Sequence, residues 1–420
     1  MIQTLRTAAS LALATLALGA FPARAADTGP IVLGVPTALG TIEGQDSLRA
    51  AKLAVEEINA AGGVEVGGVK RKLEIASIDT REAEAGVPVL DALAAMEKLI
   101  DEKKPAAIVV GSFRSEVLIP AMDVIAKYKL PYLCTIGMAP GFEPKIAGDY
   151  AKYKYNFRLG LSAPYLVGNI AKTMGFIHQK LGWDKMYFVH QDVAWATGTA
   201  NGVAKLSSAA GWKVVGNDAY PTGSRDFSSS LTKAKASGAQ VIVPIFDMPE
   251  SGVLVKQARS MKVPALIAGF ISPAAPATAW GTFNGEIGGS VNFLFEPGAI
   301  PLKTARSEHF YQAYGKAYGE ETLRKMSGHG PGPSYDSVYV LAEAIRKANS
   351  LAPDAVVAQL EKTDMDGAIG HITFNKNHQV PFGADPKKEA VTLAFQWRDG
   401  KRVVVYPESV AQSQIEAPAR

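Results

Sequence analysis

The segment 106–140 constrains the fold of this chain more than any other. Residues 106–110 form an apolar run whose length and β-branched content are typical of a strand buried on both faces of a parallel sheet. Residues 117–128 carry apolar side chains at roughly helical spacing, and residues 130–136 have the composition of a second buried strand. The segment therefore predicts a strand–helix–strand unit.

The loop between the first strand and the helix of this unit is a candidate ligand site. Gly111 ends the strand, and small, polar and charged residues follow it. In a βαβ unit the carboxyl ends of both strands and the amino end of the helix meet at one edge, where open α/β sheets bind ligands. We therefore expect one wall of a ligand site here, formed by Phe113, Arg114, Ser115 and the backbone of residues 136–138.

Strand and helix patterns alternate along most of the remaining chain. Strands are predicted at 30–36, 73–79, 185–190, 212–217, 241–246 and 265–270, and helices at 46–60, 86–101, 163–181, 195–210, 227–237, 251–261, 307–318, 334–349 and 351–364. Alternation of this kind favours right-handed crossovers and parallel sheets. Alternating apolar residues at 370–374 and 391–405, with a turn at Asp399-Gly400, predict late strands.

Two lobes are expected because the chain is long and repeats this pattern. Its 420 residues exceed the ~250 to 300 beyond which a single core usually divides. The aromatic, irregular segment 148–162 suits a first crossing between lobes. We predict an α/β fold of two similar lobes, each a parallel sheet covered by helices, joined by a three-strand hinge. The first lobe comprises residues 26–155 and 296–370, the second comprises 156–295 and 371–410, and 411–420 form a tail.

Residues 1–25 have the pattern of a cleaved secretion signal. Arg6 gives a basic start, residues 8–20 are apolar, and Ala23-Arg24-Ala25 fits an A-x-A cleavage site. The apolar run is shorter than the ~20 residues that span a bilayer, which excludes a membrane anchor. Because the expected mature amino terminus carries no cysteine, we expect a protein free in a periplasm or secreted, and not a lipoprotein.

Composition and motifs exclude several classes of function. The chain has 44 basic and 40 acidic residues and no basic run suited to nucleic acid. Its one cysteine, Cys134, lies in an apolar run and excludes an intramolecular disulfide. The sequence contains no HExxH, GxSxG or phosphate-loop motif. His371 and His378 lie around a predicted turn and could hold a metal, although such a pair is more often incidental. We expect no catalytic residue, no metal and no cofactor.

Four segments together resemble one known family. They are AKLAVEEINAAGGV at 51–64, VVGSFRSEVLIPAMDVIAKYKLPYL at 109–133, MYFVHQDVAWATG at 186–198 and GSRDFSSSLTKAKASGAQVIV at 223–243. In this order they are similar to the periplasmic leucine/isoleucine/valine-binding proteins, the type I solute receptors of ABC importers. The resemblance covers nearly the whole mature chain. It implies a monomer that closes over an amino acid or organic carboxylate and delivers it to an ABC permease in the inner membrane.

The resemblance also implies individual positions in the first lobe. Ser115 matches the loop serine whose hydroxyl, with nearby backbone N–H groups, holds the ligand carboxylate. Ile136 and Met138 match positions that supply a backbone carbonyl and a threonine hydroxyl. Glu43 falls where the first loop of the family carries an aromatic side chain.

In the second lobe the resemblance implies two contacts and one departure. Trp195 matches an aromatic residue that closes over the ligand, and Asp247 falls where the family often has a tyrosine. Ile271 replaces the acidic residue that pairs with the ligand ammonium, just as Met138 replaces the threonine. A buried ammonium without a carboxylate would cost several kcal/mol. Either Asp247 or Glu43 therefore takes over that role, or the ligand is not an α-amino acid.

Arg114 favours the second of these alternatives. Its guanidinium is a permanent cation that can bind a carboxylate through two hydrogen bonds. Together with Phe113, Phe246 and Trp195, it would suit an organic acid with an apolar or aromatic body.

Plainer interpretations of the same residues remain open. Arg114 could pair with Glu116 or Asp123, and Ser115 could be a helix cap. Asp247 could cap the segment that begins near residue 249. A sensor subunit that signals to a membrane receptor is an alternative function. A secreted α/β hydrolase, using Ser115 or His190, is a less favoured one.

Overall fold

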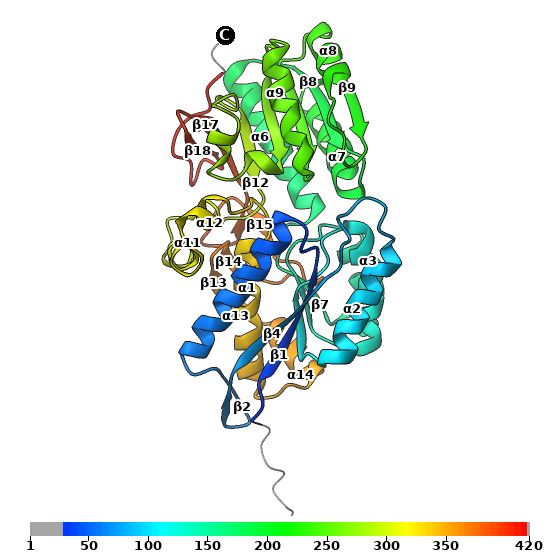
Figure 1. The fold of residues 1–420 in the computed structure, drawn as a ribbon, viewed down its shortest axis with the longest axis vertical. Coiled ribbons are helices and arrows are strands. Elements are labelled where there is room, and N and C mark those ends of the chain that lie inside the picture. Colours follow the sequence, from blue (N-terminus) through cyan, green and yellow to red (C-terminus); the bar gives the residue numbers. More distant parts are fainter. Residues whose placement is uncertain (1–27, 418–420) are drawn as a thin grey trace, which may run out of the picture.

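The structure is a computed structural model that describes residues 28–417, arranged as two α/β lobes (Figure 1). This confirms the predicted fold class. The predicted signal at residues 1–25 lies outside the described residues. Among the residues that are described, no helix is both long and apolar enough to cross a membrane.

The first lobe is built on a parallel sheet of five strands in the order β4-β1-β5-β6-β7. These strands are β1 (Ile31–Thr37), β4 (Leu73–Asp79), β5 (Ala107–Val110), β6 (Tyr132–Cys134) and β7 (Asn156–Arg158). Its main helices are α1 (Ile42–Ala60), α2 (Val89–Lys103), α3 (Ser115–Tyr128) and α13 (Pro331–Ala348). Helix α1 packs with α13 on one face of the sheet, and α2 packs with α3 on the other (Figure 1). Strands β1, β5 and β6 are buried on both faces, as their apolar sequences predict, whereas the edge strand β4 is partly exposed.

The second lobe is built on a sheet of seven strands in the order β18-β17-β12-β11-β10-β8-β9. Its strands are β8 (Lys185–Gln191), β9 (Lys213–Tyr220), β10 (Val241–Phe246), β11 (Leu266–Ile271), β12 (Val291–Leu294), β17 (Leu393–Arg398) and β18 (Lys401–Tyr406). Its helices include α6 (Ala163–Leu181), α7 (Ala194–Ala209), α8 (Ser228–Ala236) and α9 (Gly252–Ser260). Strands β17 and β18 are antiparallel and joined at Asp399-Gly400, both with positive φ, which confirms the predicted hairpin.

Smaller elements complete the two lobes. A hairpin joins β2 (Val64–Val66) to β3 (Val69–Arg71), and a sheet of four short strands contains β13 (Asp364–Gly367), β14 (Gly370–Thr373), β15 (Phe382–Gly383) and β16 (Ala390–Val391). The remaining helices are α4 (Phe142–Gly148), α5 (Tyr150–Tyr153), α10 (Ala279–Thr282), α11 (Ala305–Tyr318), α12 (Glu320–Arg324) and α14 (Pro353–Leu360), with single turns η1 (Pro249–Ser251) and η2 (Ser272–Ala274). Helix α11 and strands β13 to β15 lie beside the junction of the lobes (Figure 1).

The chain passes between the lobes three times: after β7, after β12 and between β16 and β17. Two details differ from the sequence prediction. Residues 148–162 are not irregular, because α5 and the buried edge strand β7 lie within them and β7 pairs with β6. Strand β14 pairs with β13 and does not join the second-lobe sheet. The first sheet therefore continues past residue 155, and the second lobe resumes at β17.

Buried polar groups hold the crossings in place. The guanidinium of Arg158, at the end of β7, is fully buried and donates to Gln379 and, at 2.8 Å, to the carbonyl oxygen of Ala139. The Glu296 carboxylate, just after β12, accepts a hydrogen bond of 2.8 Å from the backbone N–H of Leu161. The first and second crossings are thus tied together, and the first is also tied to the segment that leads into β15.

Gly160, at the first crossing, lies very close to the backbone that follows strand β6. A Cβ atom there would collide with the backbone carbonyl of Thr135, which cannot move without disturbing the first sheet. We expect Gly160→Ala to lower the free energy of unfolding by about 1–3 kcal/mol. Urea denaturation followed by circular dichroism measures the change.

The matched control for this substitution is Gly168→Ala in helix α6. A Cβ at Gly168 meets nothing within 4 Å, and alanine favours a helix over glycine by about 0.5–1 kcal/mol. We expect this control to unfold at an equal or higher urea concentration than the wild type. Equal destabilisation by both substitutions would contradict the close approach at Gly160.

Candidate functional site

A small pocket lies between the two lobes at the carboxyl ends of the parallel strands. Its volume is about 20 Å³, and it is lined by Glu43, Phe113, Ser115, Ile136, Met138, Trp195, Asp247, Phe270, Phe295 and His329. We call it the inner pocket. Seven of the eight ligand-binding residues predicted from the sequence line it. The eighth, Arg114, is bonded to one of them.

Arg114 forms an ion pair that joins the lobes. Its guanidinium donates to Oδ2 of Asp247, which follows β10, and the indole Nε1 of Trp195 donates to the same oxygen at 2.6 Å. The Arg114 and Asp247 side chains are each only 9% exposed. Arg114 therefore pairs with neither Glu116 nor Asp123, and the Asp247 carboxylate does not cap a helix. The predicted alternatives considered only residues near Arg114 or Asp247 in the sequence. They are wrong because each of these two residues has its partner on the other lobe.

The loop that carries Arg114 is held by a buried carboxylate. Both oxygens of Glu82 accept backbone hydrogen bonds, from the N–H groups of Phe113 and Arg114, at 3.0 Å each. Thr80 donates to the same carboxylate at 2.9 Å, and burial raises the pKa of Glu82. These two backbone N–H groups are therefore engaged within the protein, which differs from the expectation that N–H groups beside Ser115 face the ligand. Glu82 was not singled out from the sequence.

The hydroxyl of Ser115 forms no hydrogen bond within the part of the chain that the structure describes. It is the first residue of α3, and Arg114 occupies the cap position without a side-chain capping bond. The predicted alternative, a capping role for Ser115, is therefore wrong. The Oγ atom is buried without a hydrogen-bond partner among residues 28–417. A buried hydroxyl without a partner is costly, so this atom is a ready contact for a ligand in the inner pocket.

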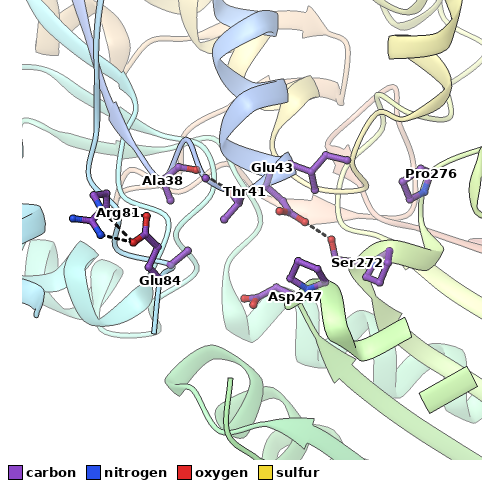
Figure 2. Close-up of a pocket in the computed structure, with 13 residues that line it drawn as sticks. Ala38, Thr41, Glu43, Arg81, Glu84, Asp247, Ser272 and Pro276 are labelled. Atoms are coloured by element: carbon purple, nitrogen blue, oxygen red, sulfur yellow. Dashed lines mark hydrogen bonds and ion pairs between the residues drawn. The ribbon is translucent and has the colours of Figure 1, made fainter. Parts of the chain in front are cut away.

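Glu43 lies on a helix and not in a loop. Helix α1 begins four residues earlier than predicted because Thr41 caps it, its Oγ1 accepting a hydrogen bond of 3.0 Å from the N–H of Gly44. Glu43 is therefore in the first turn and buried. Ser272 of the second lobe donates to its carboxyl group (Figure 2). Burial raises the pKa of Glu43 from 4.5 to about 7, so the neutral acid is well populated near neutral pH.

His329 is a site residue that the sequence analysis left as part of a rigid Gly-Pro loop. Its Nδ1 contacts the Glu296 carboxylate at 2.8 Å, and its Nε2 contacts the backbone oxygen of Ile136 at 2.9 Å. The Ile136 carbonyl oxygen and the Glu296 carboxylate are both hydrogen-bond acceptors, so a proton on each ring nitrogen of His329 would satisfy both contacts. Burial opposes this charge, but the Glu296 carboxylate and the Ile136 carbonyl outweigh burial and raise the pKa of His329 above 6.5.

The apolar wall of the pocket is aromatic. The rings of Phe270 and Phe295 lie 4.2 Å apart, centroid to centroid, and each makes an edge contact with Trp195 at about 6 Å. Phe246, expected at this wall, is instead fully buried against Phe227 in the second-lobe core. Phe270, in β11, and Phe295, directly after β12, come from segments predicted to approach the junction, and both line the inner pocket. Phe246, at the end of β10, faces the second-lobe core instead.

The inner pocket holds no arrangement typical of catalysis. His190 does not line it with Ser115; its Nδ1 contacts the carbonyl of Gln191. Within residues 28–417 no cluster of three or more histidine, cysteine or acidic side chains could hold a metal ion. His371 contacts Asp364 and Asp366, while His378 stacks on Phe157. Cys134 is buried, as predicted, and burial raises the pKa of its thiol.

Two α/β lobes, three crossings and a pocket between the lobes define a two-lobe binding protein. The chain belongs to the periplasmic binding protein family, which matches residues 32–384. Its curated relatives include Leu/Ile/Val-binding protein homolog 7 of Brucella melitensis, with 28% identity over 97% of this chain and 98% of the relative. Homolog 8 of Brucella abortus is 26% identical over 89% of this chain and 88% of the relative.

Solved structures show the same fold. A putative branched-chain amino acid ABC transporter from Silicibacter pomeroyi has a TM-score of 0.77 at 18% identity and covers 93% of this chain and 99% of its own. The substrate binding protein LivJ of Streptococcus pneumoniae, in complex with isoleucine, has a TM-score of 0.71 at 21% identity, with 90% and 100% covered. A solute binding protein of R. palustris, in complex with benzoate, has a TM-score of 0.71 at 15% identity, with 93% and 99% covered.

The raised pKa of Glu43 predicts that closure of the lobes depends on pH. Opening the lobes would expose Glu43 to water and return its pKa toward 4.5, because burial is the main cause that raises it and outweighs the hydrogen bond from Ser272. The closed form thus holds the proton more tightly, and closure weakens as pH rises from about 4.5 to 7, by about 3 kcal/mol in all. We expect the radius of gyration from small-angle X-ray scattering to increase between pH 5.5 and 8.

Two variants isolate the contribution of Glu43 to this pH dependence. Glu43→Gln removes the titrating group, so its radius of gyration should change much less with pH. Glu84→Gln, an exposed change at the mouth of the cleft, should behave as the wild type. A pH response that Glu43→Gln leaves intact would contradict this assignment.

Proposed function

We propose that this chain is the periplasmic substrate-binding subunit of an ABC importer and that it carries a small organic carboxylate. Membership of the periplasmic binding protein family supports the location and the transport role. The observation that carries the ligand assignment is the buried, unpartnered hydroxyl of Ser115 in the inner pocket, next in sequence to Arg114, whose guanidinium reaches the pocket residue Asp247. A hydroxyl donor next to a permanent cation is complementary to a carboxylate.

The pocket is a poor receptor for the ammonium group of an α-amino acid. The end of β11 offers the apolar Ile271, and the backbone carbonyl of Ile136 is already occupied by His329. The charge of Asp247 is compensated by Arg114. Glu43 is the remaining carboxyl group of the pocket, and burial favours its neutral form. An ammonium here would lack an ionised partner, at a cost of several kcal/mol.

The proposed mechanism is closure around the ligand. The carboxylate binds first to Arg114 and Ser115 on the first lobe. Closure then adds Trp195 and the phenylalanine wall, and exclusion of water strengthens the charge-assisted hydrogen bonds. Because the closed form makes contacts that the open form cannot, the ligand shifts the equilibrium toward closure. The permease in the inner membrane then binds the surface of the closed, ligand-bound form.

Related proteins bind ligands of both kinds under consideration. The Streptococcus pneumoniae protein was solved with isoleucine, and the R. palustris protein with benzoate. The aromatic wall of Trp195, Phe270 and Phe295 supports the second kind for this chain. The part of an apolar body next to the carboxylate could contact this wall while the carboxylate faces Arg114 and Ser115.

A thermal-shift screen tests the ligand class. A ligand that binds only the folded protein raises its melting temperature. We expect benzoate and related aryl or alkyl carboxylates to raise it in a concentration-dependent manner, and leucine, isoleucine and valine to leave it unchanged. Tight binding of the branched-chain amino acids would contradict the argument from Ile271 and His329.

Arg114 is expected to supply much of the affinity for the carboxylate. Charge-assisted hydrogen bonds contribute about 1.5–3 kcal/mol, so Arg114→Ala should weaken benzoate binding at least tenfold in isothermal titration calorimetry. Arg346→Ala, which removes an exposed arginine on α13, is the matched control and should bind normally. If the two variants bind benzoate equally well, Arg114 does not contact the ligand.

A further inference from the structure

A second, larger recess adjoins the inner pocket at the mouth of the cleft. Its volume is about 330 Å³, and it is lined by Ala38, Gly40, Thr41, Ile42, Glu43, Arg81, Ala83, Glu84, Asp247, Pro249, Ser272, Pro273 and Pro276 (Figure 2). We call it the outer recess. Glu43 and Asp247 line both spaces, so these two side chains lie between them.

The two spaces differ in what they can hold. The inner pocket, at about 20 Å³, has room for a group little larger than one water molecule, such as a carboxylate. A cavity of roughly 150 Å³ accommodates benzene, so the outer recess, at about 330 Å³, can take about twice that volume. The inner pocket alone is therefore too small for a whole aromatic acid in this closed form.

The walls of the outer recess suit an apolar group. Ala38, Ile42, Ala83 and three prolines are six of the thirteen lining residues, and proline side chains are rigid. The polar side chains there are already engaged with one another. The Thr41 hydroxyl donates to the Ala38 carbonyl at 2.9 Å, and Arg81 binds Glu84 at the rim (Figure 2).

Ser272 follows the same pattern, since its hydroxyl is bonded to Glu43. A polar ligand group in the outer recess would thus have to displace existing hydrogen bonds, whereas an apolar group would only displace water.

We propose that the ligand is a carboxylate with an elongated apolar body, of the arylalkanoate type, whose head lies in the inner pocket and whose body passes between Glu43 and Asp247 into the outer recess. This inference rests on the proposed function, because it takes the carboxylate to bind at Arg114 and Ser115. It adds the length of the ligand and the surface that selects for it. The first-lobe loop that carries Arg81 to Glu84 and the second-lobe prolines form that surface together.

Isothermal titration calorimetry with two acids tests the inference. Benzoate carries only a ring, whereas 4-phenylbutanoate adds three methylene groups and can reach the outer recess. We expect the wild type to bind 4-phenylbutanoate at least tenfold more tightly, because each buried methylene adds affinity. Equal affinities for the two acids would overturn the inference.

Three variants show where the additional affinity arises. Ala83→Trp and Pro273→Trp each place a large ring in the outer recess, from the first and the second lobe respectively. Both should abolish the preference for 4-phenylbutanoate, and an unchanged far-ultraviolet circular dichroism spectrum shows that the variants are folded. Ala85→Trp, an exposed change in the same loop, should keep the preference.

The outcomes separate this inference from the proposed function. Benzoate binding without a preference for the longer acid, or a preference that survives both Ala83→Trp and Pro273→Trp, overturns the inference alone. If neither acid binds the wild type, both the carboxylate assignment and the inference are wrong.

Discussion

The ion pair between Arg114 and Asp247 is the interaction on which the arrangement of the site depends. It is almost fully buried, and its two members lie on different lobes, 133 positions apart in the chain. Burying such a pair costs desolvation free energy that only good geometry and further hydrogen bonds offset. Trp195 supplies one of these bonds, and Glu82 fixes the loop that carries Arg114. Because the pair can form only when the lobes meet, it couples the site to closure.

A second set of buried hydrogen bonds connects the inner pocket to the hinge. Glu296, at the second crossing, binds both Leu161 at the first crossing and His329 at the pocket. His329 in turn binds the carbonyl of Ile136, which faces the same pocket. These hydrogen bonds form one chain from hinge to ligand site. A change in the spacing of the crossings is thus transmitted to the pocket wall through rigid, buried groups, and the same groups exclude an ammonium from the Ile136 carbonyl.

Much of this fold could be predicted from the sequence, because strand and helix periodicities follow from local burial patterns. The first-lobe wall, residues 113–138, was predicted for the same reason. What could not be predicted depends on contacts between distant segments or on cap geometry. Thr41 caps α1 before a polar first turn that does not look helical in sequence, so Glu43 lies in the helix and not in the predicted loop. Asp247, the partner of Arg114, and Ile136, one partner of His329, each lie more than 100 positions away in the chain. Phe270 lines the inner pocket, whereas Phe246 packs against Phe227 in the second-lobe core.

The most direct test of this account is the distance between the lobes with and without the ion pair. Spin labels at Leu90→Cys in α2 and Leu206→Cys in α7 suit the measurement, because these side chains are 74% and 46% exposed while Cys134 is fully buried. Double electron–electron resonance on the ligand-free protein should show a population of short distances from closed molecules, and Asp247→Asn in the same background should lower that population in favour of longer distances. Identical distributions would contradict the claim that the Arg114–Asp247 pair holds the lobes together.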